Sequence, residues 1–146
     1  MQAFKFIIAL TIFSSFSYGN PVETGHASVS LVKFDTNLST QNELFIGIKM
    51  DMQKNWHTYW KNPGDAGGPI IVKILSPEKV NIKKIYFPPP ELIPYEPLMT
   101  YGYKEEVLFP IEIDNTDLID EDTIFDFEVN LLICEDVCIP ESVVFS

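Results

Sequence analysis

Hydrophobic and polar residues alternate along most of the chain after residue 27. Alternation with a period of two is typical of half-buried β-strands. The clearest case is residues 43–52, where every second side chain from Leu44 to Met52 is apolar. The pattern predicts strands at 28–34, 43–52, 70–75, 80–87, 107–113 and 123–134, with one more beginning at 142.

Runs rich in Gly, Pro, Asn and Asp separate these segments, at 62–69, 87–94 and 114–122. Such residues favour turns. No long stretch has the 3.6-residue period of an amphipathic helix. Short strands separated by such turn-forming residues predict an all-β fold. We expect an immunoglobulin-like antiparallel β-sandwich that forms one domain over residues 20–146.

Two details of the strand pattern carry further expectations. Pro110 interrupts the segment 107–113, and because proline cannot donate a ladder hydrogen bond, we expect a sheet edge or a bulge there. The final residues, ESVVFS, have the pattern of a strand that begins and is then cut short. A shortened last strand leaves an unpaired edge. We therefore expect a sandwich that lacks part of its C-terminal strands, as a fragment of a longer protein would.

The first nineteen residues differ from the rest. Lys5 is followed by the apolar run 6–13, and small residues lie at 17 and 19. This arrangement predicts a secretory signal peptide over residues 1–19, cleaved after Gly19. A buried first strand or an uncleaved anchor ranks lower, because a polar segment follows at once. Export would place the cysteines in an oxidising compartment, where a disulfide can form.

The formal net charge of −11 bears on partners. A strongly acidic surface repels the phosphate backbone of nucleic acids and anionic lipid head groups. No nucleic-acid partner is therefore expected, and the simplest role of the charge is solubility.

Cys134 and Cys138 are the two cysteines of the chain, in the segment LLICEDVCIPES. A disulfide between them would close a ring of roughly five residues and restrict the unfolded chain by only about 2 kcal/mol, against ~4.7 for a hundred-residue loop. The sulfurs would stay close in both redox states, which suits a working dithiol. The acids Glu135 and Asp136 disfavour a thiolate and so raise the pKa of a neighbouring thiol. This suits a carrier that holds electrons for a specific partner better than a strong oxidant.

Other uses of the two sulfurs stay open. They could form a plain structural disulfide in a non-catalytic secreted sandwich. They could also bind Cu(I) or Zn(II), with His57 or a methionine such as Met50 or Met52 as a third ligand. Metal binding ranks third, since no second Cys or His cluster accompanies the pair, and no metal site is assigned. A Cys–His hydrolase ranks lower still, because the adjacent acids oppose activation of the thiol.

Three blocks of sequence carry a family likeness: NWHTYWKNPGDAGGP (55–69), FPPPELIPYEPLMTYGYKEEVLFPIEI (87–113) and LLICEDVCIPE (131–141). Together they resemble the N-terminal periplasmic domain of the DsbD thiol:disulfide interchange family, in particular its ScsB-type branch linked to copper tolerance. The resemblance implies a thiol:disulfide oxidoreductase without a cofactor. It also implies electrons arriving from a membrane-embedded domain through a thioredoxin-like domain. They would leave to periplasmic thioredoxin-fold partners, such as disulfide isomerases and the reductase of cytochrome c maturation.

The resemblance also assigns the cysteines. Cys134 and Cys138 match the redox pair of the family. By the family pattern Cys138 forms the mixed disulfide with a partner and Cys134 resolves it. The spacing is shorter than in the best-studied branch and suits the ScsB-type one. The membrane and thioredoxin-like domains are absent from these 146 residues, so they are expected elsewhere in a longer chain or on separate proteins.

The family has a cap loop over its cysteines, and the matching stretch is 96–103. Tyr101 and Gly102 match the Tyr-Gly of that loop, whereas Thr100 stands where the best-studied branch has a capping Phe. Met99 or Tyr101 is therefore expected to act as the lid. A tyrosine-bearing turn also lines the family's site. Its counterpart is Tyr59, in an aromatic group with Trp56 and Trp60 that could equally be ordinary sandwich core.

Overall fold

The computed structural model describes residues 21–34, 44–114, 116–120 and 122–146. The predicted signal peptide, residues 1–19, lies outside the described residues. Strands dominate the part that is described, and a short 3-10 helix, η2, spans Thr116–Leu118. None of the helical structure in these ranges is long and apolar enough to cross a membrane.

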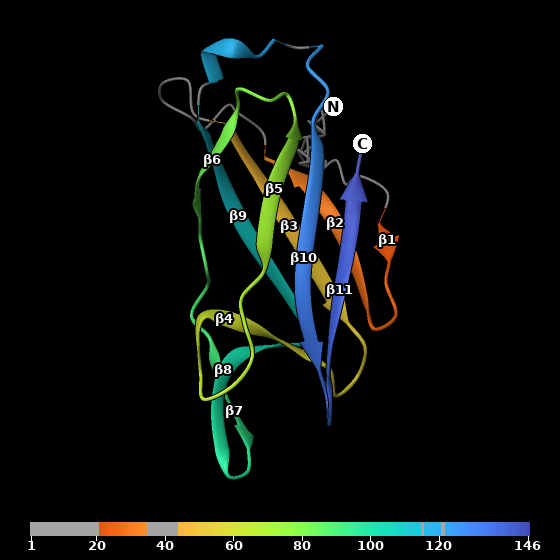
Figure 1. The fold of residues 1–146 in the computed structure, drawn as a ribbon, viewed down its shortest axis with the longest axis vertical. Coiled ribbons are helices and arrows are strands. Elements are labelled where there is room, and N and C mark those ends of the chain that lie inside the picture. Colours follow the sequence, from red (N-terminus) through yellow and green to blue (C-terminus); the bar gives the residue numbers. More distant parts are fainter. Residues whose placement is uncertain (1–20, 35–43, 115, 121) are drawn as a thin grey trace, which may run out of the picture.

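The strands form two antiparallel sheets packed face to face (Figure 1). The first sheet has the order β1-β2-β3-β9-β6. The second has the order β11-β10-β4-β8-β7, with β5 also paired to β10. The all-β, immunoglobulin-like sandwich predicted from the sequence is confirmed. The strands are β1 Val22–Glu23, β2 Ala27–Lys33, β3 Leu44–Met52, β4 His57–Gly64, β5 Ile71–Ser76, β6 Asn81–Ile85, β7 Glu91–Tyr95, β8 Leu98–Lys104, β9 Glu106–Asp114, β10 Asp126–Cys134 and β11 Cys138–Phe145.

The core between the sheets is built from the apolar face of each alternating strand. Burying such a side chain stabilises the fold by about 1.5–3 kcal/mol. The first sheet contributes fully buried side chains from β2, β3 and β9, and the second contributes its own from β10. The apolar residues with no measurable exposure are Val29, Ile48, Met50, Phe109, Ile111, Val129 and Ile133.

The structure contains strands that the sequence pattern did not predict. β7 and β8 form a hairpin where a proline-rich turn and a loop were expected. Pro94 is tolerated in β7 because this strand is at the edge of its sheet, where one side needs no donor. The last strand also differs: β11 begins at Cys138, earlier than residue 142, and pairs with β10 as far as Phe145. The predicted last strand is therefore present, and it starts four residues earlier than expected.

Pro110 lies in β9, an internal strand between β3 and β6, so the predicted sheet edge is wrong. Its place in the ladder explains why it fits. β6 ends at Ile85, opposite Ile111, so Pro110 lies just beyond the last pair of that ladder. The backbone nitrogen of Tyr86 donates to the Pro110 carbonyl at 2.8 Å, on the side where the missing N–H would point. The irregularity of this ladder falls at 82–84 instead.

β10 has two different neighbours along one side. Residues 126–130 pair with β5, whereas at the other end Cys134 pairs with His57 of β4. Between these two pairings, the side chain of Thr58 in β4 takes over the contact with β10: its Oγ1 donates to the Leu132 carbonyl at 3.0 Å. Strands β4, β8 and β7 thus form a smaller sub-sheet at the end of the sandwich where β10 terminates (Figure 1).

Candidate functional site

The two cysteines close the β10–β11 hairpin. Cys134 is the last residue of β10, Cys138 is the first of β11, and the two are direct ladder partners. Their Cα atoms are 4.1 Å apart, and the sulfurs form a disulfide with an S–S distance of 2.05 Å. Residues 135–137 make the turn, in which the Glu135 nitrogen donates to the Val137 carbonyl at 3.2 Å. The hairpin itself therefore brings the sulfurs together.

The two cysteines differ sharply in exposure. Cys134 is 1% exposed, although the inward-facing series of β10 is Phe127, Val129, Leu131 and Ile133 and alternation places Cys134 on the opposite face of the strand. Cys138 is exposed at the start of β11, next to Val137, which is 64% exposed. The Cys138 end of the disulfide is therefore more open to solvent than the Cys134 end.

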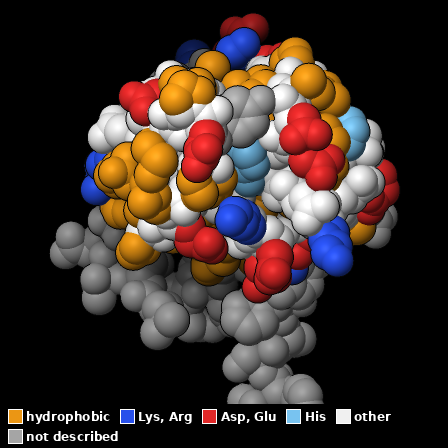
Figure 2. Space-filling view, turned by 90° about the horizontal axis from the view of Figure 1, so that it is seen from below, with side chains coloured by type: hydrophobic (Ala, Val, Ile, Leu, Met, Phe, Trp, Pro, Cys, Tyr) orange, Lys and Arg blue, Asp and Glu red, His pale blue; other side chains and the backbone are white. Residues whose placement is uncertain are grey.

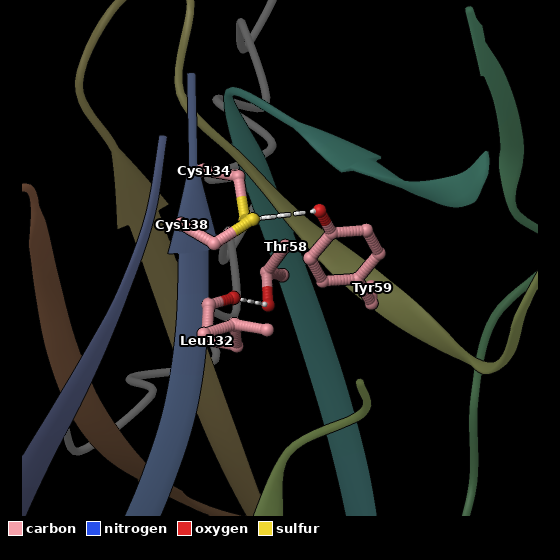
Figure 3. Close-up of a disulfide and its surroundings, with 5 residues drawn as sticks. All are labelled: Thr58, Tyr59, Leu132, Cys134 and Cys138. Carbon is pink, nitrogen blue, oxygen red and sulfur yellow. Dashed lines mark hydrogen bonds between the residues drawn. A yellow bond between two sulfur atoms is a disulfide. The ribbon is translucent and has the colours of Figure 1, made fainter. Parts of the chain in front are cut away.

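Tyr59 supplies the polar contact to the sulfurs (Figure 3). Its hydroxyl donates to Cys134 Sγ at 2.9 Å and lies 3.3 Å from Cys138 Sγ. Disulfide sulfurs carry no proton, so the hydroxyl is the donor in both contacts. The ring is 2% exposed, which holds the hydroxyl in place. The sequence left two roles open for Tyr59, ordinary core packing or lining of the redox site. In the structure Tyr59 contacts the cysteines directly.

His57 lies beside the same sulfurs. It is the ladder partner of Cys134, is 5% exposed, and meets the Tyr59 ring edge-on with 5.2 Å between centroids. Burial, and secondarily the charge of Lys104, lowers the pKa of His57 below its usual 6.5. The imidazole is therefore neutral at pH 7. Across the described ranges, no three or more His, Cys, Asp or Glu side chains are grouped so that they could hold a metal ion.

The expected cap residues lie on strand β8 and not in a loop. Their side chains alternate: Thr100 and Gly102 are buried, whereas Met99 and Tyr101 are 40% and 42% exposed. Thr100 Oγ1 donates to the Ile93 carbonyl at 2.9 Å, which fastens β8 to β7. Thr100 is therefore a structural residue of the hairpin and not an outward lid.

Gly102 is the member of this segment that is directly tied to the site. It is the ladder partner of Tyr59, and a Cβ at this position would be 2.0 Å from the Thr58 carbonyl oxygen. Only glycine permits this approach of β8 to β4. Gly102 thus lets β8 lie close enough to support Tyr59.

The other aromatic residues of the group pack elsewhere. The ring of Trp56 stacks on that of His26 with 3.8 Å between centroids, and Trp60 meets Tyr101 edge-on at 6.4 Å. His57 and Thr58, beside Tyr59 in β4, were not assigned to the redox site from sequence. No local signal marks them, since their role depends on the pairing of β4 with β10.

Comparisons with known proteins show which family the chain belongs to. The sequence profile of the family described as "Thiol:disulfide interchange protein DsbD, N-terminal" matches residues 28–146. The N-terminal periplasmic domain of ScsB from Proteus mirabilis has a similar fold, with a TM-score of 0.69 and 21% identity over 89% of this chain and 50% of that one. The chain thus spans about half the length of that domain.

A second solved structure is more distant. The N-terminal domain of Neisseria meningitidis DsbD in the reduced form gives a TM-score of 0.48 and 12% identity, covering 77% of this chain and 91% of that one. No curated protein sequence matches. The profile match covers most of the chain and includes both cysteines. The chain belongs to the family of DsbD N-terminal domains, which are parts of thiol:disulfide interchange proteins.

Proposed function

We propose that this domain is a thiol:disulfide oxidoreductase module that relays electrons by exchanging its Cys134–Cys138 disulfide with other proteins. One observation carries the proposal: the disulfide joins an exposed residue, Cys138, to a buried one, Cys134. A structural staple has no need of this asymmetry. An exchange reaction needs one sulfur that a partner can reach and one that it cannot.

The exchange proceeds in two steps that conserve electrons. The Cys138 thiolate of the reduced domain attacks a partner disulfide, forms a mixed disulfide and releases one partner thiolate. The Cys134 thiolate then attacks Cys138 Sγ, re-forms the internal bond and releases the second partner thiolate. Two electrons pass to the partner. Recharging runs in reverse: a donor thiolate attacks Cys138 Sγ and Cys134 leaves as a thiolate.

Tyr59 has a chemical role in this scheme. During recharging, negative charge develops on Cys134 Sγ, a sulfur that is cut off from water. A hydrogen bond from the Tyr59 hydroxyl, 2.9 Å away, stabilises that charge. Neutral His57 adds no like or opposite charge at pH 7, so the hydroxyl is the specific polar group at the leaving sulfur.

Family membership supports the choice of partners. We assign the domain to the periplasm, exported by the segment 1–19. Electrons would come from a membrane-embedded domain through a thioredoxin-like domain, in the same chain or on a separate one. They would pass to periplasmic thioredoxin-fold proteins.

The outer face of the β7–β8 hairpin fits contact with such a partner. The ladder pairs Leu92–Tyr101 and Pro94–Met99 place four exposed side chains on one face. Figure 2 looks at this end of the molecule and shows hydrophobic side chains gathered there. Met99 and Tyr101, which the family resemblance assigns to the cap, belong to this apolar face.

Trapping tests the assignment of the two cysteines. The reduced Cys134→Ser variant is mixed with an oxidised periplasmic thioredoxin-fold protein, quenched with acid, and run on a non-reducing gel. A covalent complex that dithiothreitol dissolves is expected. Cys138→Ser is the matched control and should give none. An adduct that forms only with Cys138→Ser would reverse the assignment, and no adduct with either would refute exchange with this class of partner.

The reduction potential separates exchange from a structural bond. Equilibration in glutathione or dithiothreitol buffers, followed by thiol labelling, should place the pair above about −300 mV, the region of exchanging disulfides. A value well below that would identify a structural disulfide and refute the proposed function.

A further inference from the structure

The loop that follows β4 turns back over Tyr59. Gly67 has φ +92°, and a Cβ built there would lie 2.2 Å from ring atoms of Tyr59. Pro69, two residues on, forms an isolated parallel bridge with Tyr59. The backbone of Gly67 thus lies directly against the Tyr59 ring, so that a side chain at position 67 would have no room. This contact helps to bury the ring and limits the directions in which its hydroxyl can move.

The same loop is fastened to strand β8. The Asp65 nitrogen donates to the Met99 carbonyl at 3.0 Å, and the Met99 nitrogen donates to Asp65 Oδ2 at 2.9 Å. Gly64, with φ +91°, lets the backbones come this close, because a Cβ there would be 2.5 Å from the Met99 carbonyl oxygen. The loop is therefore held at two points: Asp65 is bonded to the β7–β8 hairpin, and Gly67 lies against Tyr59.

These contacts form one continuous path. It begins at Met99 on the partly exposed hairpin, passes through Asp65 and Gly67, and ends at the Tyr59 hydroxyl on the sulfurs. The links are the hydrogen bonds between Met99 and Asp65, the chain itself from Asp65 to Gly67, the van der Waals contact of Gly67 with the Tyr59 ring, and the hydrogen bond from Tyr59 to Cys134. The position of the hydroxyl therefore depends on a loop more than five residues away in sequence.

We propose that Asp65 and Gly67 are positioning residues for the disulfide: they clamp Tyr59 so that its hydroxyl stays on Cys134. This rests on the proposed exchange function, in which that hydrogen bond assists the departure of the Cys134 thiolate. Neither residue touches a sulfur in this scheme. Both act through Tyr59.

The test measures the rate at which dithiothreitol reduces the oxidised domain. In this reaction a dithiothreitol thiolate attacks Cys138 Sγ, the S–S bond breaks and Cys134 leaves. The second thiol then closes oxidised dithiothreitol and releases Cys138. Asp65→Ala should slow the reduction about threefold to tenfold. Asp65→Asn keeps an oxygen acceptor for the Met99 nitrogen and should stay within about twofold of the wild type.

The decisive comparison uses the Tyr59→Phe background. If Asp65 acts through the hydroxyl, Asp65→Ala should cause no further slowing once that hydroxyl is gone. Gly67→Ala should behave in the same way if it folds, and the Asp65 variants decide the matter if it does not. Full slowing by Asp65→Ala in the Tyr59→Phe background, or no slowing in the wild type, would overturn the proposal. Because dithiothreitol is a small molecule, the reduction rates can be interpreted even if the partner-trapping experiment fails.

Discussion

Replacing Tyr59 by phenylalanine removes a single oxygen atom from the site. The ring stays, so its packing against Gly67 and the edge of His57 is preserved. What is lost is the donor that lies 2.9 Å from Cys134 Sγ and 3.3 Å from Cys138 Sγ. The substitution therefore separates the chemical role of Tyr59 from its role in the core.

The expected effect follows from where the charge develops. A hydrogen bond to a charged acceptor contributes roughly 1.5–3 kcal/mol, whereas an uncharged disulfide sulfur is a weak acceptor. In thiol–disulfide exchange the negative charge on the leaving sulfur is only partly developed in the transition state, so we count about half of that contribution. The barrier to reduction should thus rise by about 0.7–1.5 kcal/mol, which is a roughly 3- to 12-fold slower rate.

The assay follows reduction of the oxidised domain by excess dithiothreitol at fixed pH, quenched at intervals with a thiol-alkylating reagent. Tyr103→Phe is the matched control. Tyr103 is also buried in this sheet, at 5% exposure, and its hydroxyl donates to the Pro88 carbonyl at 2.7 Å. Its loss should reduce stability and leave the reduction rate unchanged.

Two results would refute the reasoning. One is a Tyr59→Phe variant that is folded by near-ultraviolet circular dichroism and is reduced within twofold of the wild-type rate. The other is equal slowing by Tyr103→Phe, which would assign the effect to general loosening of the sheet.

Three further predictions concern stability, measured by urea unfolding. Ile48→Ala should lower the free energy of unfolding by about 2–5 kcal/mol, because Ile48 is fully buried, whereas Ile124→Ala, at a side chain 73% exposed, should change it by less than about 0.5 kcal/mol; equal losses would contradict the assigned core. Because the pKa of His57 is lower in the folded than in the unfolded protein, the unfolded chain binds more protons as the pH falls below 6.5. The free energy of unfolding should therefore decline from pH 7.5 to pH 5.5, and it should decline less in His57→Gln. An equal decline in the wild type and in His57→Gln would contradict this. Hydrogen bonding to Lys83 lowers the pKa of Glu112 in the folded protein, so this carboxylate stabilises the fold above its unfolded pKa of 4.5 and stops doing so as the pH falls through its lower folded pKa. Glu112→Gln should therefore reduce the free energy of unfolding more at pH 7 than at pH 3. An equal reduction at both pH values would contradict the ion pair with Lys83.

The alternation of side chains was enough to predict most of the sandwich. Residues 43–52 and 107–113 became β3 and β9 with nearly the expected bounds, because one face of each is buried and the other is solvated. β7 escaped prediction because Pro94 and the three prolines at 88–90 favour turns, and only the place of β7 at a sheet edge makes Pro94 acceptable. Edge position is a property of the assembled sheet, which a local pattern does not encode.

The candidate site was predictable to a different degree. Cys134 and Cys138 were identifiable from their spacing and surroundings, and the family likeness pointed to Tyr59. The hydrogen bond between Tyr59 and Cys134 joins residues 75 positions apart and depends on the pairing of β4 with β10. The clamp through Asp65 and Gly67 also depends on that arrangement. In sequence, both residues belong to an ordinary turn-forming run.

The divided pairing of β10 has a consequence for how this domain can change over evolution. The half of β10 beside β5 belongs to the main sandwich, whereas its last residue, Cys134, borders the β4–β8–β7 sub-sheet. The disulfide therefore lies at the boundary between the main sandwich and the β4–β8–β7 sub-sheet. Under the proposed exchange function, substitutions at the exposed residues Leu92, Pro94, Met99 and Tyr101 would change which partner surfaces fit the sub-sheet, while the disulfide at its border would stay the same.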